Sequence, residues 1–103
     1  MAYEIYKRPQ AVRDIEECFV YIAEENLDIG VYFLAAVEES IERLADFPQL
    51  GTKRDFQNKR FENIRMWQVK KYEKYLIFYE ISENRIEIIR VLHASRDLND
   101  VFG

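Results

Sequence analysis

The sequence predicts an α+β fold in which an N-terminal strand and an α-helical hairpin precede a three-stranded, mainly antiparallel sheet (β-α-α-β-β-β). Apolar residues recur at three- and four-residue steps between residues 9 and 47, a spacing typical of buried helix faces. Three short apolar runs separated by polar breaks follow residue 63, as expected for consecutive strands. A length of 103 residues with 49% hydrophobic residues suits a single domain over residues 1–103.

The first half of the chain is expected to form one strand and two helices. Residues 3–7 are rich in tyrosine and isoleucine, which is typical of a strand, and Pro9 favours the start of a helix. The apolar stripe of this helix is Val12, Ile15, Phe19 and Ile22. The stripe of the second helix is Ile29, Phe33, Ala36 or Val37, Ile41 and Leu44. Because about five polar residues, with Asn26 or Asp28 as a cap, separate the stripes, the helices should pack antiparallel until Pro48 ends the second one.

The second half is expected to form a long exposed loop and then the sheet. Residues 49–63 carry Gly51 and four basic side chains without a clear period, which indicates a loop. The three strands are expected at Ile64–Val69, Tyr75–Ile81 and Ile86–Leu92. Residues 82–85 have hairpin length, whereas residues 70–74 either turn or continue the neighbouring strands.

Both faces of the middle strand are apolar, so both need cover. The two alternating sets are Tyr75, Ile77, Tyr79 and Ile81 on one face and Leu76 and Phe78 on the other. The helical hairpin can cover only one face. We expect the tyrosines and Trp67 to lie on the second face. This face would be closed either by the ends of the chain or by a partner.

Charge and cysteine usage restrict the classes of function. The net charge of −4 argues against non-specific coating of nucleic acid. Residues 1–50 carry a net charge of −7 and residues 51–103 a net charge of +3, so an anionic partner would dock on the second half, unless the acidic helices only solvate one side. Cys18, the single cysteine, is expected to be a small core residue in a reducing cytoplasm. Neither a signal peptide nor a membrane-spanning run is visible.

Several kinds of catalytic site are poorly supported. One cysteine and one histidine cannot make a usual zinc site, so we predict no metal. Three scattered glycines cannot form a phosphate-binding loop. Ser95 lies beside His93 and Asp97, but residues two apart on one segment rarely converge into a hydrolase triad.

The strongest candidate site follows the last predicted strand. His93, Arg96 and Asp97 lie where a strand's end would hold them rigidly. Taken alone, His93 is expected to be a capping or hydrogen-bonded structural residue. The wider basic and aromatic set of the second half is Arg65, Trp67, Lys70, Lys71, Lys74, Arg90, His93 and Arg96. Such side chains can bind phosphates and stack on bases, stabilise a pentavalent phosphate, or simply keep the surface soluble.

These segments, in their order and spacing, resemble the toxins of the RelE/ParE superfamily of bacterial type II toxin–antitoxin modules, including plasmid stabilisation systems. The likeness lies in YEIYKRPQAVRDIEECFVYIAEEN, in Leu44, Pro48 and Gly51 at the end of the second helix, in Arg65, and in YLIFYEI and RVLHASRDL. It covers almost the whole chain. The resemblance implies a helical hairpin against a mainly antiparallel sheet, and a cognate antitoxin that covers exposed apolar surface.

The superfamily divides by target, so the resemblance implies two different activities. ParE-like members are described as inhibitors of DNA gyrase, and the first helix and the Pro48–Gly51 junction resemble them more closely. RelE-like members cleave messenger RNA at the ribosomal A site without a metal, by a basic cleft and, in the best-known form, a tyrosine near the C-terminus. Lys71 and Arg96 fall near such basic positions, but Phe102, which has no proton to exchange, occupies the position of the tyrosine.

Three hypotheses result. The favoured one is a non-enzymatic gyrase inhibitor neutralised by an antitoxin; its contact residues would be Arg65, Trp67, Tyr75, Tyr79 and Arg96. The alternative is a metal-free, ribosome-dependent endoribonuclease; its catalytic residues would be Arg65, Lys71, His93 and Arg96. The third is an inactive member that only binds a partner. None requires a cofactor or a membrane, and a homodimer or a heterotetramer with the antitoxin is compatible with all three.

Overall fold

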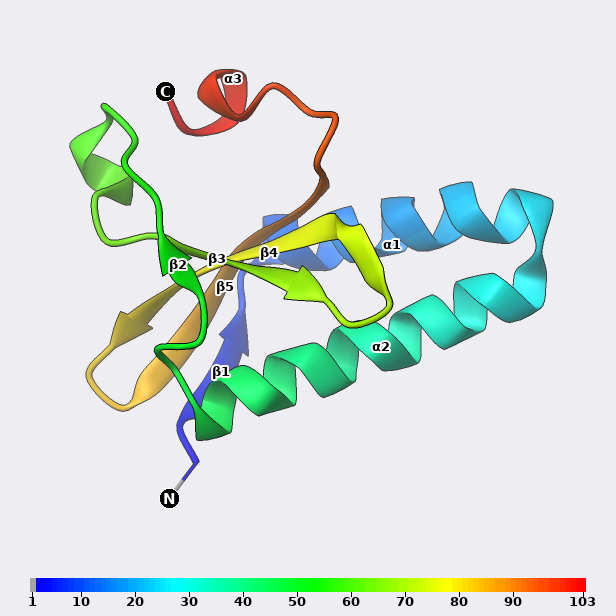
Figure 1. The fold of residues 1–103 in the computed structure, drawn as a ribbon, viewed down its shortest axis with the longest axis horizontal. Coiled ribbons are helices and arrows are strands. Elements are labelled where there is room, and N and C mark those ends of the chain that lie inside the picture. Colours follow the sequence, from blue (N-terminus) through cyan, green and yellow to red (C-terminus); the bar gives the residue numbers. More distant parts are fainter. Residues whose placement is uncertain (1) are drawn as a thin grey trace.

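A computed structural model of the chain describes residues 2–103 and confirms the α+β fold (Figure 1). The elements in chain order are β1 (Glu4–Lys7), α1 (Pro9–Glu25), α2 (Leu27–Asp46), β2 (Thr52–Lys53), a 3-10 turn η1 (Lys59–Phe61), β3 (Arg65–Val69), β4 (Tyr72–Ser82), β5 (Arg85–His93) and α3 (Leu98–Phe102). The strands form one sheet in the order β1-β5-β4-β3-β2. The hairpin of α1 and α2 packs against one face of this sheet.

The sheet is mixed and has five strands where three were expected. β1 lies at one edge of the sheet, parallel to β5 with Ile5 opposite Ile86, and the two helices carry the chain from β1 to β2 at the opposite edge. The other pairings are antiparallel. The chain turns tightly between β3 and β4, where Lys71 adopts a φ of 69°, so residues 70–74 are partly a turn and partly the start of β4.

The two helices are joined by one residue instead of the expected five. Pro9 opens α1 as predicted. Asn26 separates the helices and caps α2, since its side-chain oxygen accepts a hydrogen bond from the Ile29 N–H at 3.1 Å. A Cβ atom on Gly30 would lie 2.9 Å from the Cβ of Ala23, so glycine allows the helices to approach closely at this end.

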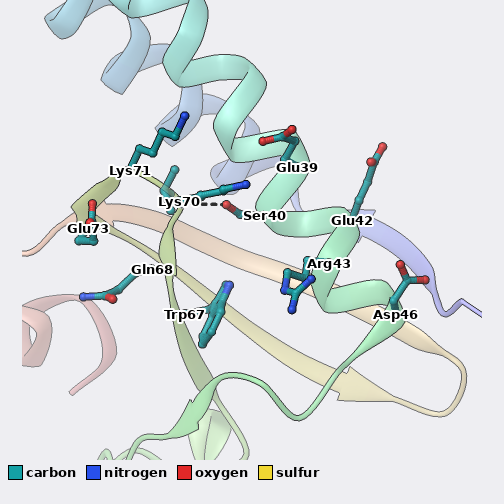
Figure 2. A pocket seen from close by; sticks show the side chains of 11 residues that line it. Glu39, Ser40, Glu42, Arg43, Asp46, Trp67, Gln68, Lys70, Lys71 and Glu73 are labelled. Atoms are coloured by element: carbon teal, nitrogen blue, oxygen red, sulfur yellow. Dashed lines mark hydrogen bonds between the residues drawn. The ribbon is translucent and has the colours of Figure 1, made fainter.

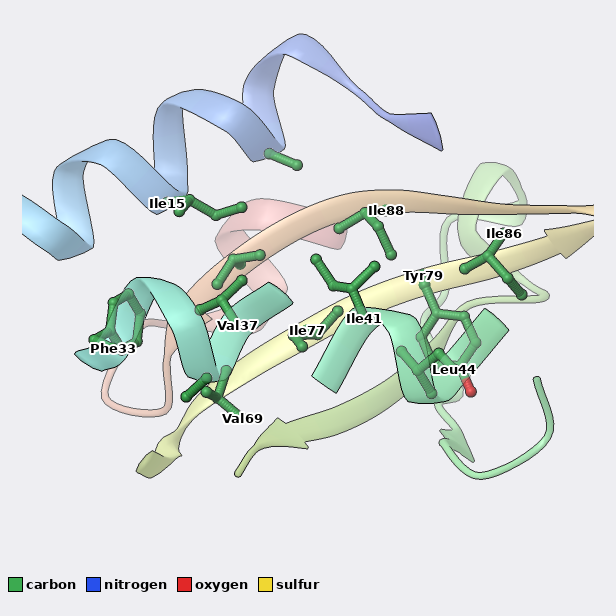
Figure 3. Close-up of a cluster of buried hydrophobic side chains, with 13 residues drawn as sticks. Ile15, Phe33, Val37, Ile41, Leu44, Val69, Ile77, Tyr79, Ile86 and Ile88 are labelled. Atoms are coloured by element: carbon green, nitrogen blue, oxygen red, sulfur yellow. The ribbon is translucent and has the colours of Figure 1, made fainter. Parts of the chain in front are cut away.

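The larger core lies between the hairpin and the sheet (Figure 3). Most of the predicted helix stripes face it, including Ile15, Phe33 and Leu44. The prediction that Val12 and Ile29 belong to the buried stripes was wrong, because these side chains are 39% and 44% exposed.

The assignment of the two sheet faces was wrong. Ile77 and Tyr79 face the hairpin, and Trp67, opposite Ile77, packs against the same core. The other face, which carries Leu76 and Phe78, is closed by the chain's own end. The other members of that second cluster are Phe56, Ile64, Ile89, Leu92 and Phe102, with Phe61, Met66, Leu98 and Val101 partly buried around them.

Residues 49–63 are more ordered than the predicted exposed loop. They contain β2 and η1, and Phe56 turns inward to contact Phe102 with ring centroids 4.8 Å apart. The aromatic side chains that fix this segment are far apart in sequence from their partners, which is why no local period revealed them. The segment is therefore part of the cover of the second face.

Candidate functional site

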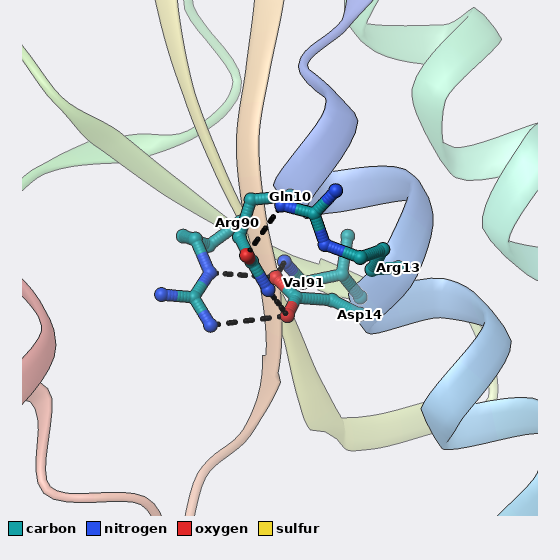
Figure 4. A network of polar contacts seen from close by, with 5 residues as sticks. All are labelled: Gln10, Arg13, Asp14, Arg90 and Val91. Carbon is teal, nitrogen blue, oxygen red and sulfur yellow. Dashed lines mark hydrogen bonds and ion pairs between the residues drawn. The ribbon is translucent and has the colours of Figure 1, made fainter.

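A buried carboxylate fixes the last strand to the first helix. Asp14 accepts hydrogen bonds from Nε and Nη2 of Arg90 at 2.7 and 3.0 Å and from the Val91 N–H at 3.1 Å (Figure 4). The side-chain amide of Gln10 donates to the same carboxylate at 3.1 Å. Because a buried charge is tolerated only when it is paired and hydrogen-bonded, this network holds α1 and β5 in one position. The end of β5 is thereby placed rigidly.

Of the three polar groups His93, Arg96 and Asp97 at the end of β5 and in the turn that follows, two have structural partners. Nδ1 of His93 accepts a hydrogen bond from the Ser95 N–H at 3.0 Å, so its lone pair is occupied by the turn. Asp97 caps α3 by accepting from the Asn99 N–H at 3.0 Å. Arg96 differs, since it is exposed and forms no ion pair within residues 2–103. It is the member of the trio that is free to contact another molecule.

A cleft of about 330 Å³ lies between α1 and the end of β5. Its walls are Asp14, Glu17, Cys18 and Tyr21 from α1, Tyr75 from β4, and Val91, Leu92, His93, Ser95 and Arg96 from β5 and the following turn. The rings of Tyr75 and His93 meet edge to face with centroids 5.0 Å apart, and Tyr75 also packs against Phe33. The cleft thus has an aromatic floor and charged rims.

Two side chains that line the cleft, Cys18 and Tyr75, have raised pKa values. Burial raises the pKa of the Cys18 thiol to about 11, with further contributions from the carboxylates of Asp14 and Glu17. Burial also raises the pKa of Tyr75, and Cys18 and Tyr21 add to the effect. A protonated thiol is a poor nucleophile, so the cleft is better equipped for binding than for covalent chemistry. Cys18 lines this cleft and is half-buried, so its expected place in the core was only partly correct.

Large apolar side chains are exposed on the hairpin near the connection between its helices. This hairpin surface consists of Val20, Tyr21, Leu27, Ile29, Val31 and Tyr32. Tyr21 is 72% exposed and also lines the cleft. It borders two further hollows, one with Val20 and Glu24 and one with Ile29 and Glu25. The hairpin surface and the cleft therefore meet at Tyr21.

The four residues of the ribonuclease hypothesis are not brought together. Nη1 of Arg65 donates to the Gly51 carbonyl at 2.7 Å and holds the segment before β2. Lys71 lies in the turn at the other end of β3, six residues away, or about 20 Å at the rise of a strand. Only His93 and Arg96 share the cleft.

The predicted contact residues are also divided. Tyr75 and Arg96 line the cleft between α1 and β5, whereas Trp67 lines a second cleft between α2 and β3 (Figure 2). Tyr79 must be removed from the set because it is fully buried. Its hydroxyl donates to the Pro48 carbonyl at 2.6 Å and accepts from the Gly51 N–H at 2.8 Å, and burial raises its pKa. A Cβ on Gly51 would lie 2.5 Å from that hydroxyl, so glycine is required there.

Comparison with protein families identifies the chain. Residues 5–98 match the family model described as ParE toxin of type II toxin-antitoxin system, parDE. The chain belongs to the ParE toxin family. The predicted superfamily resemblance is therefore confirmed, and the match lies on the ParE-like side of the superfamily.

Solved structures show the same fold for this ParE-family chain. A chain from the structure described as "Chromosomal ParDE TA system from P. aeruginosa" aligns with a TM-score of 0.70 at 12% sequence identity. The alignment covers 89% of this chain and 96% of that chain, and at this identity it shows the fold alone. No curated protein matches the sequence.

The described residues offer neither a metal site nor a membrane-spanning helix. Over residues 2–103, no group of three or more His, Cys, Asp and Glu side chains is arranged to hold a metal ion. None of the helices in that range combines the length and the apolar character needed to cross a bilayer.

The hairpin surface was missed by the sequence reasoning, although a signal was present. Val20 and Tyr21 are large apolar residues that fall outside the stripe defined by Phe19 and Ile22. On a helix with one buried face, such residues point to solvent or to a partner.

Proposed function

We propose that this ParE-family protein acts in the cytoplasm as a toxin that binds DNA gyrase, and that a cognate antitoxin neutralises it. The observation that carries the proposal is the meeting of the exposed hairpin surface with the cleft at Tyr21. Exposed apolar side chains that gather beside a cleft, as Val20, Tyr21 and Ile29 do here, are typical of a protein-binding site. A partner seated there would contact Tyr75 and Arg96 as well.

The geometry of the candidate residues favours binding over catalysis. Arg65, Lys71 and His93 lie at three separate places, so they cannot act on one phosphate. Phe102 is buried against Phe78 with ring centroids 4.8 Å apart, so the tail offers no proton donor. We therefore prefer gyrase inhibition over RNA cleavage.

The charge around the hairpin surface suggests the chemistry of the antitoxin segment. Glu16, Glu17, Glu24 and Glu25 are exposed along α1 beside Tyr21. An amphipathic helix with an apolar stripe flanked by lysine or arginine would match both the apolar area and the acidic rim.

Two assays test the target. Induction of the chain in bacteria should trigger the DNA-damage response, and the purified protein should stall supercoiling by gyrase. Cleavage of ribosome-bound message would overturn the proposal in favour of the RelE-like alternative. Normal growth with neither activity would identify an inactive member.

The antitoxin arm is tested with the same strain. Co-expression of the cognate antitoxin should restore growth. In a binding assay with the purified antitoxin, Tyr21→Asp should lose the complex while Lys59→Asp, an exposed control on the far side, should keep it. Unchanged binding by both variants would place the antitoxin elsewhere. Sedimentation of the toxin alone and in complex would distinguish a homodimer from a heterotetramer.

A further inference from the structure

The edge of the sheet beyond β2 is partly open. β2 pairs only with Arg65 and Met66, so residues 67–69 of β3 have no strand beside them on that side within residues 2–103. In an antiparallel strand, alternate residues direct their backbone N–H and C=O groups to opposite sides. The Ile64 carbonyl accepts from the Arg54 N–H on the β2 side, so Gln68, four residues on, turns its N–H and C=O to the same side.

The open stretch is short because both of its ends are occupied. At one end Met66 pairs with Thr52. At the other end the Lys70 N–H donates to Oγ of Ser40 on α2 at 3.0 Å, and the pairing of β3 with β4 shifts register between Gln68 and Val69. Bulges and lysines are common guards of sheet edges, and here they leave room for a segment of about three to four residues.

The open edge borders the second cleft, which has a volume of about 640 Å³ (Figure 2). Trp67 turns its ring into this cleft, toward Arg43. The wall formed by α2 carries three exposed carboxylates, on Glu39, Glu42 and Asp46, and one guanidinium, on Arg43, so its net charge is −2 (three negative charges less one positive). Lys70, Lys71 and Glu73 line the cleft at the turn between β3 and β4 and at the start of β4. A chain laid along the edge would therefore meet backbone groups, an aromatic ring and a negatively charged wall at once.

We propose that this edge binds a short, extended, basic segment of a partner protein as an added strand. The segment's backbone bonds to the N–H and C=O of Gln68, an apolar side chain packs on Trp67, and lysine or arginine side chains pair with the carboxylates of α2. Strand addition of this kind draws its affinity from main-chain hydrogen bonds and its specificity from alternate side chains. The inference does not depend on gyrase or on the hairpin surface.

Trp67 is the only tryptophan of the chain, so its emission reports directly on the second cleft. The probe is the peptide Thr-Lys-Thr-Val-Thr-Lys-Thr with blocked ends, which places both lysines and the valine on one face of the added strand. It is compared with the same peptide carrying glutamate for lysine. We expect the basic peptide to shift the Trp67 emission, to slow exchange of the Gln68 amide at least tenfold, and to bind at least tenfold more tightly than the acidic one. Equal binding of both peptides, or unchanged exchange at Gln68, would overturn the proposal.

Matched variants separate the charge and the backbone contributions. The double variant Glu39→Gln, Glu42→Gln should bind the basic peptide at least threefold more weakly. The control double variant Glu16→Gln, Glu17→Gln on α1 should bind it with unchanged affinity. A peptide with N-methyl groups on its edge-facing amides keeps the side chains but should lose binding; retained binding would exclude strand addition. A concentration-dependent shift of Trp67 emission without peptide would show that a second copy occupies the edge, and would also overturn the proposal.

Discussion

The hairpin-covered face of the sheet buries thirteen hydrophobic residues, whereas the opposite face buries seven and depends on the last helix for cover. α1 and α2 together supply long, regular cover to the first face. The five-residue α3 and the segment around Phe56 cover the second. Because local stability follows the number of buried apolar contacts, the second face should open first, and the first should persist as the support of the hairpin surface.

The largest effect is expected at Phe102, the centre of the second face. Its ring is 1% exposed and contacts the rings of Phe56, Phe61 and Phe78. Phe102→Ala should lower the free energy of unfolding by about 3–5 kcal/mol in urea titrations. Val101→Ala, a partly buried neighbour, should cost less than about 1.5 kcal/mol.

Hydrogen exchange of the Phe102→Ala variant separates the two faces. Amides of α3 and of residues 52–62 should lose protection before those of α2. Simultaneous loss in α2 would show that both faces form one cooperative unit and would contradict the comparison.

The next effect concerns the first face, where Asp14 pairs with Arg90. Asp14→Ala leaves the mostly buried guanidinium of Arg90 without its partner, so we expect a loss of about 3 kcal/mol in the free energy of unfolding. Asp14→Ala combined with Arg90→Met should recover part of this loss, because no charge is then left unpaired. A loss below 1 kcal/mol for the single variant would mean that packing alone holds α1 to β5.

The sequence predicted what local patterns determine. Pro9, Pro48 and the alternation in β4 located the helices and strands, since helix starts, helix ends and strand periodicity depend on near neighbours. The alternation showed that Ile77 and Tyr79 share a face, but not which face the hairpin covers. That choice, like the burial of Phe102, depends on contacts between distant segments.

The candidate site was predicted in part for the same reason. The position after β5 was found, because a strand's end is visible in the sequence. The separate roles of its residues were not predicted, because the hydrogen bond from the Ser95 N–H to His93 and the capping role of Asp97 depend on the conformation of the turn. The place of Arg65, turned toward Gly51, follows from the path of the segment before β2.

A smaller effect is expected at the hydroxyl of Tyr79, which ties the end of the hairpin to the first face. Tyr79→Phe removes two hydrogen bonds and leaves the Gly51 N–H unsatisfied, so we expect a loss of about 1–3 kcal/mol in thermal or urea unfolding. Tyr75→Phe is the control, because Tyr75 contacts its neighbours through its ring and should change stability by less than about 0.5 kcal/mol. Equal losses in the two variants would assign the effect to the rings.

A still smaller effect, dependent on pH, is expected at Glu87 on β5. Hydrogen bonds from Arg8 and then from Arg85 lower the pKa of this carboxyl below its ordinary value of about 4.3. The stabilisation by the ionised form is therefore complete above that value and is lost as the pH falls through the lower pKa of the folded state. Between pH 6 and pH 2, the free energy of unfolding of Glu87→Gln should fall less steeply than that of the unmodified protein. Parallel curves for the two proteins would show that Glu87 gives no net stabilisation.

The smallest effect on stability is expected at Arg96, between the cleft and the tail. Arg96→Ala should change the free energy of unfolding by less than about 0.5 kcal/mol and abolish toxicity, because the side chain is exposed and lines the cleft. Lys59→Ala, equally exposed, should leave growth inhibition intact. A large loss of stability in Arg96→Ala would make this residue part of the fold and not of the contact surface.

The single-residue connection at Asn26 has a consequence for the rate and thermodynamics of association. Only one residue connects α1 to α2, and Gly30 lies against Ala23. The two helices therefore have little freedom to move relative to each other. In the proposed complex with an antitoxin, the hairpin surface is already preorganised, so little conformational entropy would be lost on this side. Any folding that accompanies association must then occur in the partner chain, which would give the complex a large negative heat-capacity change without a change in the toxin's own backbone.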